Sequence, residues 1–431
     1  MGKTTFLAAG DAFMTRRLPE GGYEGFEALR SCIVSHDVRF LNLESTFHQQ
    51  EGYPAAASGG TWAMSDPRSL DDMKAYGFNI FNTANNHSGD YGELGVLATI
   101  ENLRSRDMLF SGTGKDLGEA SKPCYLETKH ARVALVSCCA SFPAAFRAGP
   151  QTQDMVGRPG LNPIRYSEVF HLDPAHFEMA QKVAAASGIN RIRERSVRNG
   201  FASPPKEGTL TMGASGFVLD DRCWVESTPN AEDLKRIVAE IQEAKRQADI
   251  VLVSVHNHFI DGSESNIPPK FLKDFAHACV DAGASAIIGH GPHELQGIEV
   301  YNGGLILYSI GNFIFQTDTV EYQPGDAYAN RGLPMDTKVG QLMDIRSKNG
   351  TAGYCVQWPI WNGVMAAWTM EDRAITEVQL YPVELGMDLP RSRKGSPVLS
   401  CSEKTLAYLQ QLSQPFGTKL EVENGVGYIR L

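Results

Sequence analysis

The sequence predicts an α/β protein built on layered sheets, and two observations predict it. Short apolar runs of strand length recur between residues 6 and 136 and again after residue 250, and segments with apolar residues at helical spacing lie between them. Alternation of these two patterns is typical of sheets covered by helices, because both kinds of element bury their apolar faces against a neighbouring layer.

The elements of the first half follow one another at short intervals. Strands are expected at residues 6–9, 39–43, 79–83 and 133–136, and helices at 23–34, 70–76 and 94–104. The segment 23–34 illustrates the evidence, since Phe26, Leu29 and Ile33 fall on one face of a helix. This half of the chain is therefore predicted to alternate between strands and helices.

The same regularity returns at residue 231. Helices are expected at 231–247, 269–282 and near 402–413, strands at 250–255, 286–288, 305–308 and 313–315, a β-like region at 352–382, and two short strands at the end. The helix 231–247 has Leu234, Ile237, Ile241 and Ala244 on one stripe, which is the pattern of a helix that covers a sheet.

Residues 141–230 interrupt the pattern. Pro, Gly, Ser and Arg are frequent there and hydrophobic periodicity is weak, so we interpret this segment as an insertion into a single domain that spans residues 1–431. Insertions on α/β scaffolds often form lids or substrate walls. A surface excursion without such a role fits the pattern equally well.

The composition excludes several classes of protein. The chain has 431 residues, a formal net charge of −10 and eight scattered cysteines, which fit reduced thiols. An acidic chain repels the nucleic-acid backbone, so no nucleic-acid partner is expected. No run of about 18 apolar residues indicates a membrane span, and Asp11 follows the first strand too early to leave room for a signal peptide. A cytoplasmic protein without a membrane partner is expected.

Side chains that bind metals or move protons follow five of the predicted strands. They are Asp11, then Asn42 and Glu44, then Asn85, Asn86, His87 and Asp90, then His256 and His258, and finally His290 and His293. Sites of open α/β sheets form beyond the carboxyl ends of strands, so these groups are expected to converge. Asn86 alone fits a turn and Asp90 alone fits a helix cap. The grouping of carboxylates and imidazoles favours a metal or catalytic site.

The same segments carry a resemblance to a known family. They read AGD at 9–11, LNLE at 41–44, ANNHSGDYG at 84–92, VH at 255–256, GHGPH at 289–293 and YSIGNF at 308–313. In this order they resemble the CapA family, which is named for poly-γ-glutamate capsule proteins and is related to the calcineurin-like metallophosphoesterases. The resemblance implies a calcineurin-like four-layer αββα sandwich with metal bound at the strand ends.

The resemblance also implies roles for individual residues. Asp11, Glu44, Asn86, His256 and the closing histidine cluster at 290–293 correspond to metal-ligand positions, and His87 with Asp90 corresponds to a His–Asp pair used as a general acid. Three departures are visible. The first strand lacks the histidine of Asp-x-His, and glycine stands at residue 291 in place of the first histidine of His-Pro-His. Residues 256–258 read His-Asn-His where the family usually has His-Trp-Gly. One of two metal positions has thus lost ligands.

This loss suggests a different use of the site. Without a metal between them, Asp11 and His293 are expected to hydrogen-bond and to form a second His–Asp pair. The remaining cation would lie on Glu44, Asn86 and His256. Its oxygen-rich ligation favours Ca²⁺, with Mn²⁺ or Mg²⁺ possible and Zn²⁺ less suited. The roles of His258 and His290, and the oligomeric state, stay open.

Two His–Asp pairs across one cation suit two-base chemistry, in which one base removes a Cα proton and the other returns a proton to the opposite face. Within the family, this pattern resembles an epimerase that inverts the C-terminal residue of a lasso-peptide precursor. We therefore expect catalytic roles for His87, Asp90, His293 and Asp11, and a precursor peptide as partner. The alternatives are a metal-dependent hydrolase of γ-glutamyl amide or phosphoester bonds, and a binding protein that has lost catalysis.

Overall fold

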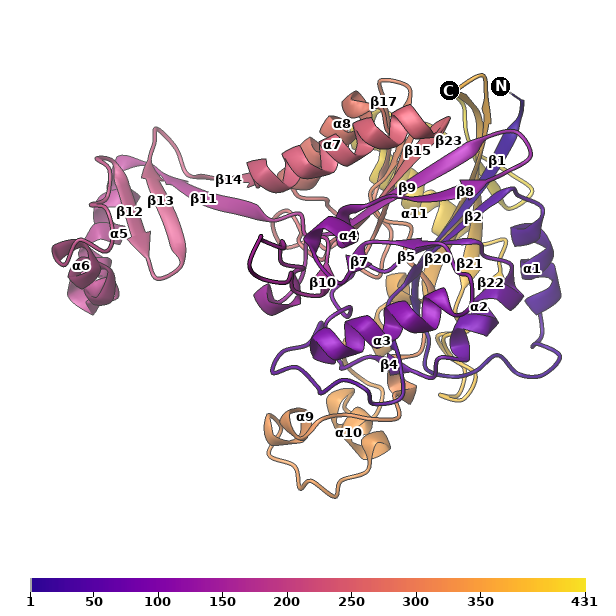
Figure 1. Cartoon of the computed structure of the whole chain (residues 1–431), viewed down its shortest axis with the longest axis horizontal. Coiled ribbons are helices and arrows are strands. Elements are labelled where there is room, and N and C mark those ends of the chain that lie inside the picture. The colour runs from indigo at the N-terminus through magenta and orange to yellow at the C-terminus, as the bar shows by residue number, and fades with distance from the viewer. Residues whose placement is uncertain (1) are drawn as a thin grey trace.

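The computed structural model describes residues 2–431 and arranges them as two stacked β-sheets with helices on both outer faces (Figure 1). The predicted α/β class and the αββα order of layers are confirmed. Within these residues no helix is both long and apolar enough to cross a lipid bilayer.

The first sheet contains ten strands among the described residues and has the order β23-β24-β21-β20-β1-β2-β5-β6, with β19 beside β1 and β22 beside β21. Its strands are β1 (Thr4–Phe13), β2 (Val38–Leu43), β5 (Ile80–Asn82), β6 (Phe110–Ser111), β19 (Asn312–Phe315), β20 (Asn362–Glu371), β21 (Ala374–Glu384), β22 (Val398–Leu399), β23 (Leu420–Glu423) and β24 (Val426–Ile429). Helices α1 (Phe26–Val34), α2 (Ser69–Tyr76) and α3 (Gly92–Arg104) follow its strands, and side chains of α1 and α2 share a core with its outer face.

The second sheet has the order β17-β18-β16-β15-β9-β8. Its strands are β8 (Cys124–Glu127), β9 (Arg132–Cys139), β15 (Ile250–His256), β16 (Ala286–His290), β17 (Ile298–Tyr301) and β18 (Gly304–Leu307). Helices α7 (Ala231–Gln247) and α8 (Lys270–Ala282) cover its outer face, and Ile237, Ile241 and Phe275 belong to that core. The Asn230 side chain accepts from the Asp233 amide and so caps the start of α7.

The apolar layer between the two sheets holds the fold together. Phe6 and Phe40 from the first sheet meet Leu135 and Leu252 from the second, and all four are fully buried. Every residue of β15 is buried, as expected for a central strand of a parallel sheet covered on both faces. The central parallel strands β1, β2 and β5 of one sheet and β9, β15 and β16 of the other thus end beside one another, and this edge carries the site.

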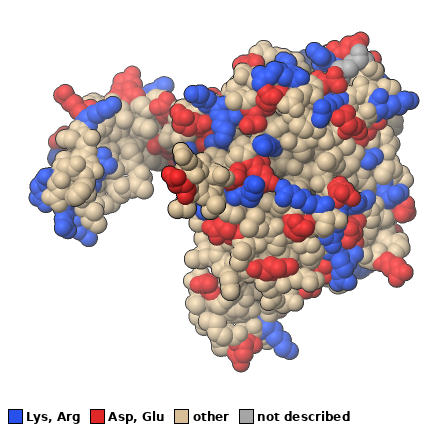
Figure 2. All heavy atoms as spheres, viewed as in Figure 1, with Lys and Arg blue, Asp and Glu red and all other residues tan. Residues whose placement is uncertain are grey.

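An arm projects from this body (Figure 1). It is a four-stranded sheet of order β12-β13-β11-β14 with two helices, and the elements are β11 (Tyr166–Leu172), α5 (Pro174–Ser187), α6 (Arg191–Arg198), β12 (Thr209–Met212), β13 (Ser215–Leu219) and β14 (Trp224–Pro229). Lys and Arg side chains gather at its far end (Figure 2), where α6 carries four arginines. The first part of the predicted insertion instead packs on the body, since β10 (Gly160–Leu161) pairs with β7 (Thr113–Gly114).

A second excursion, residues 316–361, forms a cap of short elements. These are 3-10 turns at Thr317–Thr319, Gly353–Val356 and Trp358–Trp361, with helices α9 (Gly325–Ala329) and α10 (Val339–Arg346) between them. The β-like reading of 352–382 is therefore wrong for its first ten residues, where strand β20 has not yet begun. The remaining elements are β3 (Thr46–Phe47), β4 (Met64–Ser65), α4 (Leu117–Ser121), α11 (Glu403–Ser413) and 3-10 turns at Ala144–Phe146 and Gln414–Phe416.

Candidate active site

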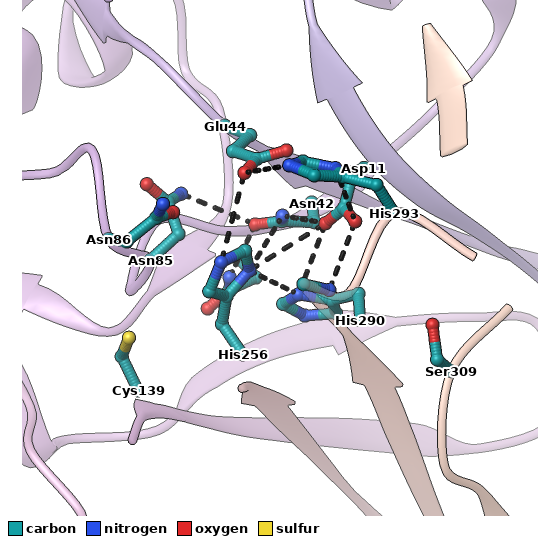
Figure 3. A network of polar contacts seen from close by, with 12 residues as sticks. Asp11, Asn42, Glu44, Asn85, Asn86, Cys139, His256, His290, His293 and Ser309 are labelled. Carbon is teal, nitrogen blue, oxygen red and sulfur yellow. Dashed lines mark hydrogen bonds and ion pairs between the residues drawn. The ribbon is translucent and has the colours of Figure 1, made fainter. Parts of the chain in front are cut away.

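The polar residues predicted from the strand ends meet at the carboxyl edge of the two sheets. Figure 3 shows Asp11, Glu44, His256, His290 and His293 turned toward one another, with Asn85 and Asn86 at one side. They come from β1, the turn after β2, the turn after β5, the end of β15 and the end of β16. The convergence expected from the topology is present in the structure.

Asp11 sits where β1 changes its partner. Its strand pairs with β20 up to Ala8 and with β19 from Asp11 onward, so Asp11 lies in register with Asn312. The preceding Gly10 permits this switch, because a Cβ there would lie 1.8 Å from the carbonyl oxygen of Gly311. The Asp11 carboxylate accepts from Asn42 Nδ2 at 2.7 Å and from the Gly291 amide at 3.0 Å.

The predicted hydrogen bond between Asp11 and His293 is replaced by a longer contact, because the His293 imidazole has another hydrogen-bond partner. His293 Nδ1 lies 3.5 Å from Asp11 Oδ2, but it donates to Asn312 Oδ1 at 2.9 Å. The amide nitrogen of Asn312 donates to the carbonyls of His293 and Ile360, so its oxygen must face the ring. Asn312 takes the place of Asp11 as the hydrogen-bond acceptor of His293 because the β1–β19 register sets Asn312 beside Asp11. His293 also adopts a φ of 63°, a strained backbone typical of functional sites.

The charge of Asp11 is retained despite its burial. Burial raises the pKa of this carboxyl, but the contact with His293, the field of His290 and the Asn42 amide outweigh that effect and leave the pKa below its ordinary value. Asp11 is therefore an anion at neutral pH and attracts protons or cations to the edge of the sheet.

The predicted pair of His87 and Asp90 is fully formed. His87 Nδ1 donates to Asp90 Oδ2 at 2.7 Å, and the same carboxylate accepts from the amides of Gly59 at 3.0 Å and Ala63 at 2.8 Å. Burial nevertheless raises the pKa of Asp90. Since Nδ1 is engaged, Nε2 of His87 is the atom free for proton transfer.

Two aromatic side chains position the two imidazoles. Phe13 and Phe315 are paired across β1 and β19. The His87 ring stands edge-on to Phe13 with 5.2 Å between centroids, and the His293 ring lies 4.9 Å from Phe315. These phenylalanines lie in neighbouring strands, so each imidazole packs against an aromatic ring at the same edge of the sheet.

Glu44 is a buried carboxylate without a hydrogen-bond donor. Both of its oxygens are unpartnered within the described chain, and its closest ion-pair contacts are imidazole nitrogens of His293 at 3.6 Å and His256 at 3.8 Å. Burial and the negative charges of Asp11 and Asp90 raise the pKa of Glu44 well above its ordinary value. The carbonyl oxygen of the Asn86 side chain is likewise buried without a partner. Such orphaned oxygens are costly unless a cation binds them.

Two histidines whose roles the sequence left open join the site. His290 Nδ1 lies 2.9 Å from His256 Nδ1, and His258 Nε2 lies 3.0 Å from His256 Nε2. Burial lowers the pKa of His258 to about 3 and that of His290 to about 4, and it also lowers the pKa of His256 well below its ordinary value. These imidazoles are neutral at physiological pH, so they do not neutralise the carboxylates and are free to act as metal ligands.

The donor set fits a divalent cation. At this site, three groups have their ligand atoms within 4.8 Å of one another: Asp11 with His256 and His290, Glu44 with His256 and His258, and Asp11 with Glu44 and His293. They share members and form one continuous cluster of carboxylates and imidazoles. Glu44 and His256 are the predicted ligands that fall within it, and Asn86 adds a buried amide oxygen. The sequence underestimated the imidazole ligands, because His258 and His290 occupy positions outside the expected pattern.

A family model settles the family of the chain. The model described as bacterial capsule synthesis protein PGA_cap matches residues 5–317, which contain every residue of the site. The chain belongs to this family. The predicted resemblance to CapA proteins is thereby confirmed at the level of the family.

Relatives of the PGA_cap chain include proteins named for capsule synthesis. Capsule biosynthesis protein CapA of Bacillus anthracis is 27% identical over 73% of the chain and 60% of its own length. A protein of Sinorhizobium fredii named uncharacterized protein y4sH is 31% identical over 99% of the chain and 93% of its own length. The structure of a putative 5'-nucleotidase from Staphylococcus aureus aligns with 95% of the chain and 58% of that protein, at 11% identity and a TM-score of 0.37.

Proposed function

We propose that this chain is a metal-dependent peptide epimerase. Its substrate would be a ribosomal lasso-peptide precursor, and it would invert the configuration at the Cα of the C-terminal residue. The observation that carries the proposal is the pair of oriented imidazoles, His87 and His293, around the unpartnered carboxylate of Glu44. Each imidazole has its Nδ1 tied to an acceptor, so each presents Nε2 as a base.

The chemistry requires two proton-transfer groups and no oxidant. One imidazole removes the Cα proton and becomes an imidazolium, and the other imidazole, already protonated, delivers its proton to the opposite face. One Cα–H bond breaks and one forms, so the only net change is the configuration. Asp90 stabilises the imidazolium of His87, and Asp11, 3.5 Å from His293 Nδ1, does the same for His293.

The Cα proton is weakly acidic, so the negative charge that develops on the adjacent carbonyl must be stabilised. A divalent cation held by Glu44, Asn86 and His256 supplies that stabilisation when bound. The oxygens of Glu44 and Asn86 favour Ca²⁺, whereas the imidazoles of His258 and His290 move the balance toward Mn²⁺. His87 and His293 are each only 4% exposed, so bulk water has little access to either imidazole.

The test separates the two bases by stereochemistry. His87→Gln and His293→Gln, with the metal loaded, should each abolish epimerisation of a precursor peptide. Each variant should still exchange the Cα proton with deuterium from D₂O, one variant from the L-peptide and the other from the D-peptide. Exchange from both stereoisomers in both variants would contradict the assignment of two bases.

One observation favours a second function, that of a two-metal hydrolase. The three overlapping groups of ligands provide more imidazoles than one cation needs, which is the arrangement of a two-metal hydrolase. Two metal ions per chain, with turnover of p-nitrophenyl phosphate or of γ-glutamyl p-nitroanilide, would establish this alternative.

A further inference from the structure

An arginine of the cap lies beside the active site without an anionic partner. Arg346 ends α10, and its side chain donates to the hydroxyl of Thr61. Within residues 2–431 it makes no ion pair with a carboxylate, unlike its neighbour Arg391, which binds Asp344. The negative charge of Asp318 acts on Arg346 without forming an ion pair with it, so guanidinium donors are available to a ligand.

The contact with Thr61 anchors Arg346 to one side of the site. Thr61 belongs to the segment 59–63, whose backbone also binds the first His–Asp pair. The Gly59 and Ala63 amides donate to Asp90, and the Gly59 carbonyl accepts from Asn86. Arg346 is therefore held close to the segment that shapes the surroundings of His87.

Tyr354 connects the same region to the other imidazole. Its ring lies 5.6 Å from the His293 ring and 5.5 Å from Phe315. Burial raises the pKa of the Tyr354 phenol. The negative charges of Glu44 and Asp11 also raise this pKa, whereas the positive charge of Arg346 lowers it. Tyr354, Arg346 and Asp318 line one cavity of about 180 Å³.

We propose that Arg346, with Tyr354 beside it, binds the C-terminal carboxylate of the substrate peptide. The inference rests on the proposed function for the identity of the ligand, but the anion site itself follows from the cap. Asp11, Glu44 and Asp90 would repel a substrate carboxylate, so a fixed cation is needed to hold it near them. A guanidinium suits this task, since its fork of donors matches a carboxylate.

The subsite also explains which residue would be inverted. In a peptide, the Cα of the last residue is one bond from the carboxylate carbon. A carboxylate held by Arg346 beside Tyr354 would therefore bring that Cα, and not one further along the peptide, toward His293, which the Tyr354 ring contacts. Asp318 lines the same cavity, and its negative charge selects against doubly charged groups such as phosphate monoesters.

The experiment compares two probes on the metal-loaded protein. N-acetyl-Gly-Phe, chosen because Tyr354 and Phe315 form an aromatic wall, and its C-terminal amide are titrated by calorimetry. The wild type should bind the free carboxylate at least about tenfold tighter than the amide. Arg346→Gln should remove this preference, Arg346→Lys should keep part of it, and Arg193→Gln, an exposed arginine on helix α6 of the arm, should leave it unchanged.

Each outcome bears on the proposal. A preference that persists in Arg346→Gln, in protein whose thermal unfolding matches the wild type, would overturn it, as would displacement of N-acetyl-Gly-Phe by inorganic phosphate at lower concentration than by acetate. Loss of the preference without any Cα deuterium exchange in the wild type would support the anion subsite and count against the epimerase.

Discussion

His293 and Asn312 form a hydrogen bond of 2.9 Å between Nδ1 and the side-chain oxygen, which fixes the proton of this imidazole on Nδ1. The remaining nitrogen, Nε2, then lies 3.6 Å from Glu44 Oε1. The nitrogen of His293 that we propose as a base thus lies next to Glu44, whose oxygens have no hydrogen-bond donor among the described residues. Asn312 on strand β19 therefore orients the His293 ring, and Asp11 places a negative charge 3.5 Å from its Nδ1.

Glu44 is expected to affect both metal affinity and the stability of the metal-free chain. In metal-free protein, Glu44→Gln should raise the free energy of unfolding by about 1–3 kcal/mol, because a buried carboxylate without a donor is removed. The raised pKa means that this gain grows as pH rises above the ordinary value of a glutamate. Metal affinity should fall by about 100-fold or more. Urea unfolding with and without metal measures both effects, and the exposed Glu371→Gln should change neither.

The buried imidazoles make the metal-free chain sensitive to acid. Burial lowers the pKa of His290 to about 4 from an unfolded value of 6.5, so between these pH values the unfolded chain binds a proton that the folded chain does not. Stability is therefore present above pH 6.5 and is lost as pH falls toward 4. His290→Gln should reduce the slope of unfolding free energy against pH by about 1 kcal/mol per unit. Cys139→Ala, a buried neighbour whose thiol does not titrate there, should keep the slope.

Gly291 holds the loop that supplies an amide to Asp11. Its φ is +120°, and an added Cβ would lie 2.6 Å from the carbonyl oxygen of Asn257. Gly291→Ala should therefore cost about 3 kcal/mol or more and weaken metal binding. Gly262→Ala is the matched control, because it has a φ of +70° but open space around it. Equal losses in the two variants would show that the close approach at residue 291 is unimportant.

The arm can be removed without cutting through the core. Val169 on β11 is paired with Glu226 on β14, near the point where the arm leaves the body. Joining these residues through two glycines, with residues 170–225 deleted, should leave metal content unchanged and the thermal midpoint within a few degrees of the wild type. If the arm is a substrate wall, KM for a precursor peptide should rise while KM for N-acetyl-Gly-Phe stays constant. An unfolded product would show that the arm belongs to the folding unit.

The strand ends could be located from the sequence because apolar runs and the polar residues after them are local signals. Asp11, Glu44 and His256 follow such runs directly, and the parallel topology brings them together. The partner of His293 could not be predicted in this way, since Asn312 reaches it only through the register of β1 and β19. Arg346 and Tyr354 belong to a cap of short turns, whose packing depends on contacts far apart in the chain.

The most direct test of the proposed function follows one atom in the wild-type protein. A precursor peptide with an L residue at its C-terminus is incubated with metal-loaded protein in D₂O, and configuration and label at that Cα are measured by chiral amino-acid analysis and mass spectrometry. We predict conversion to the D residue with one deuterium at Cα and an intact peptide chain. A cleaved peptide, or no deuterium at Cα, would contradict two-base epimerisation.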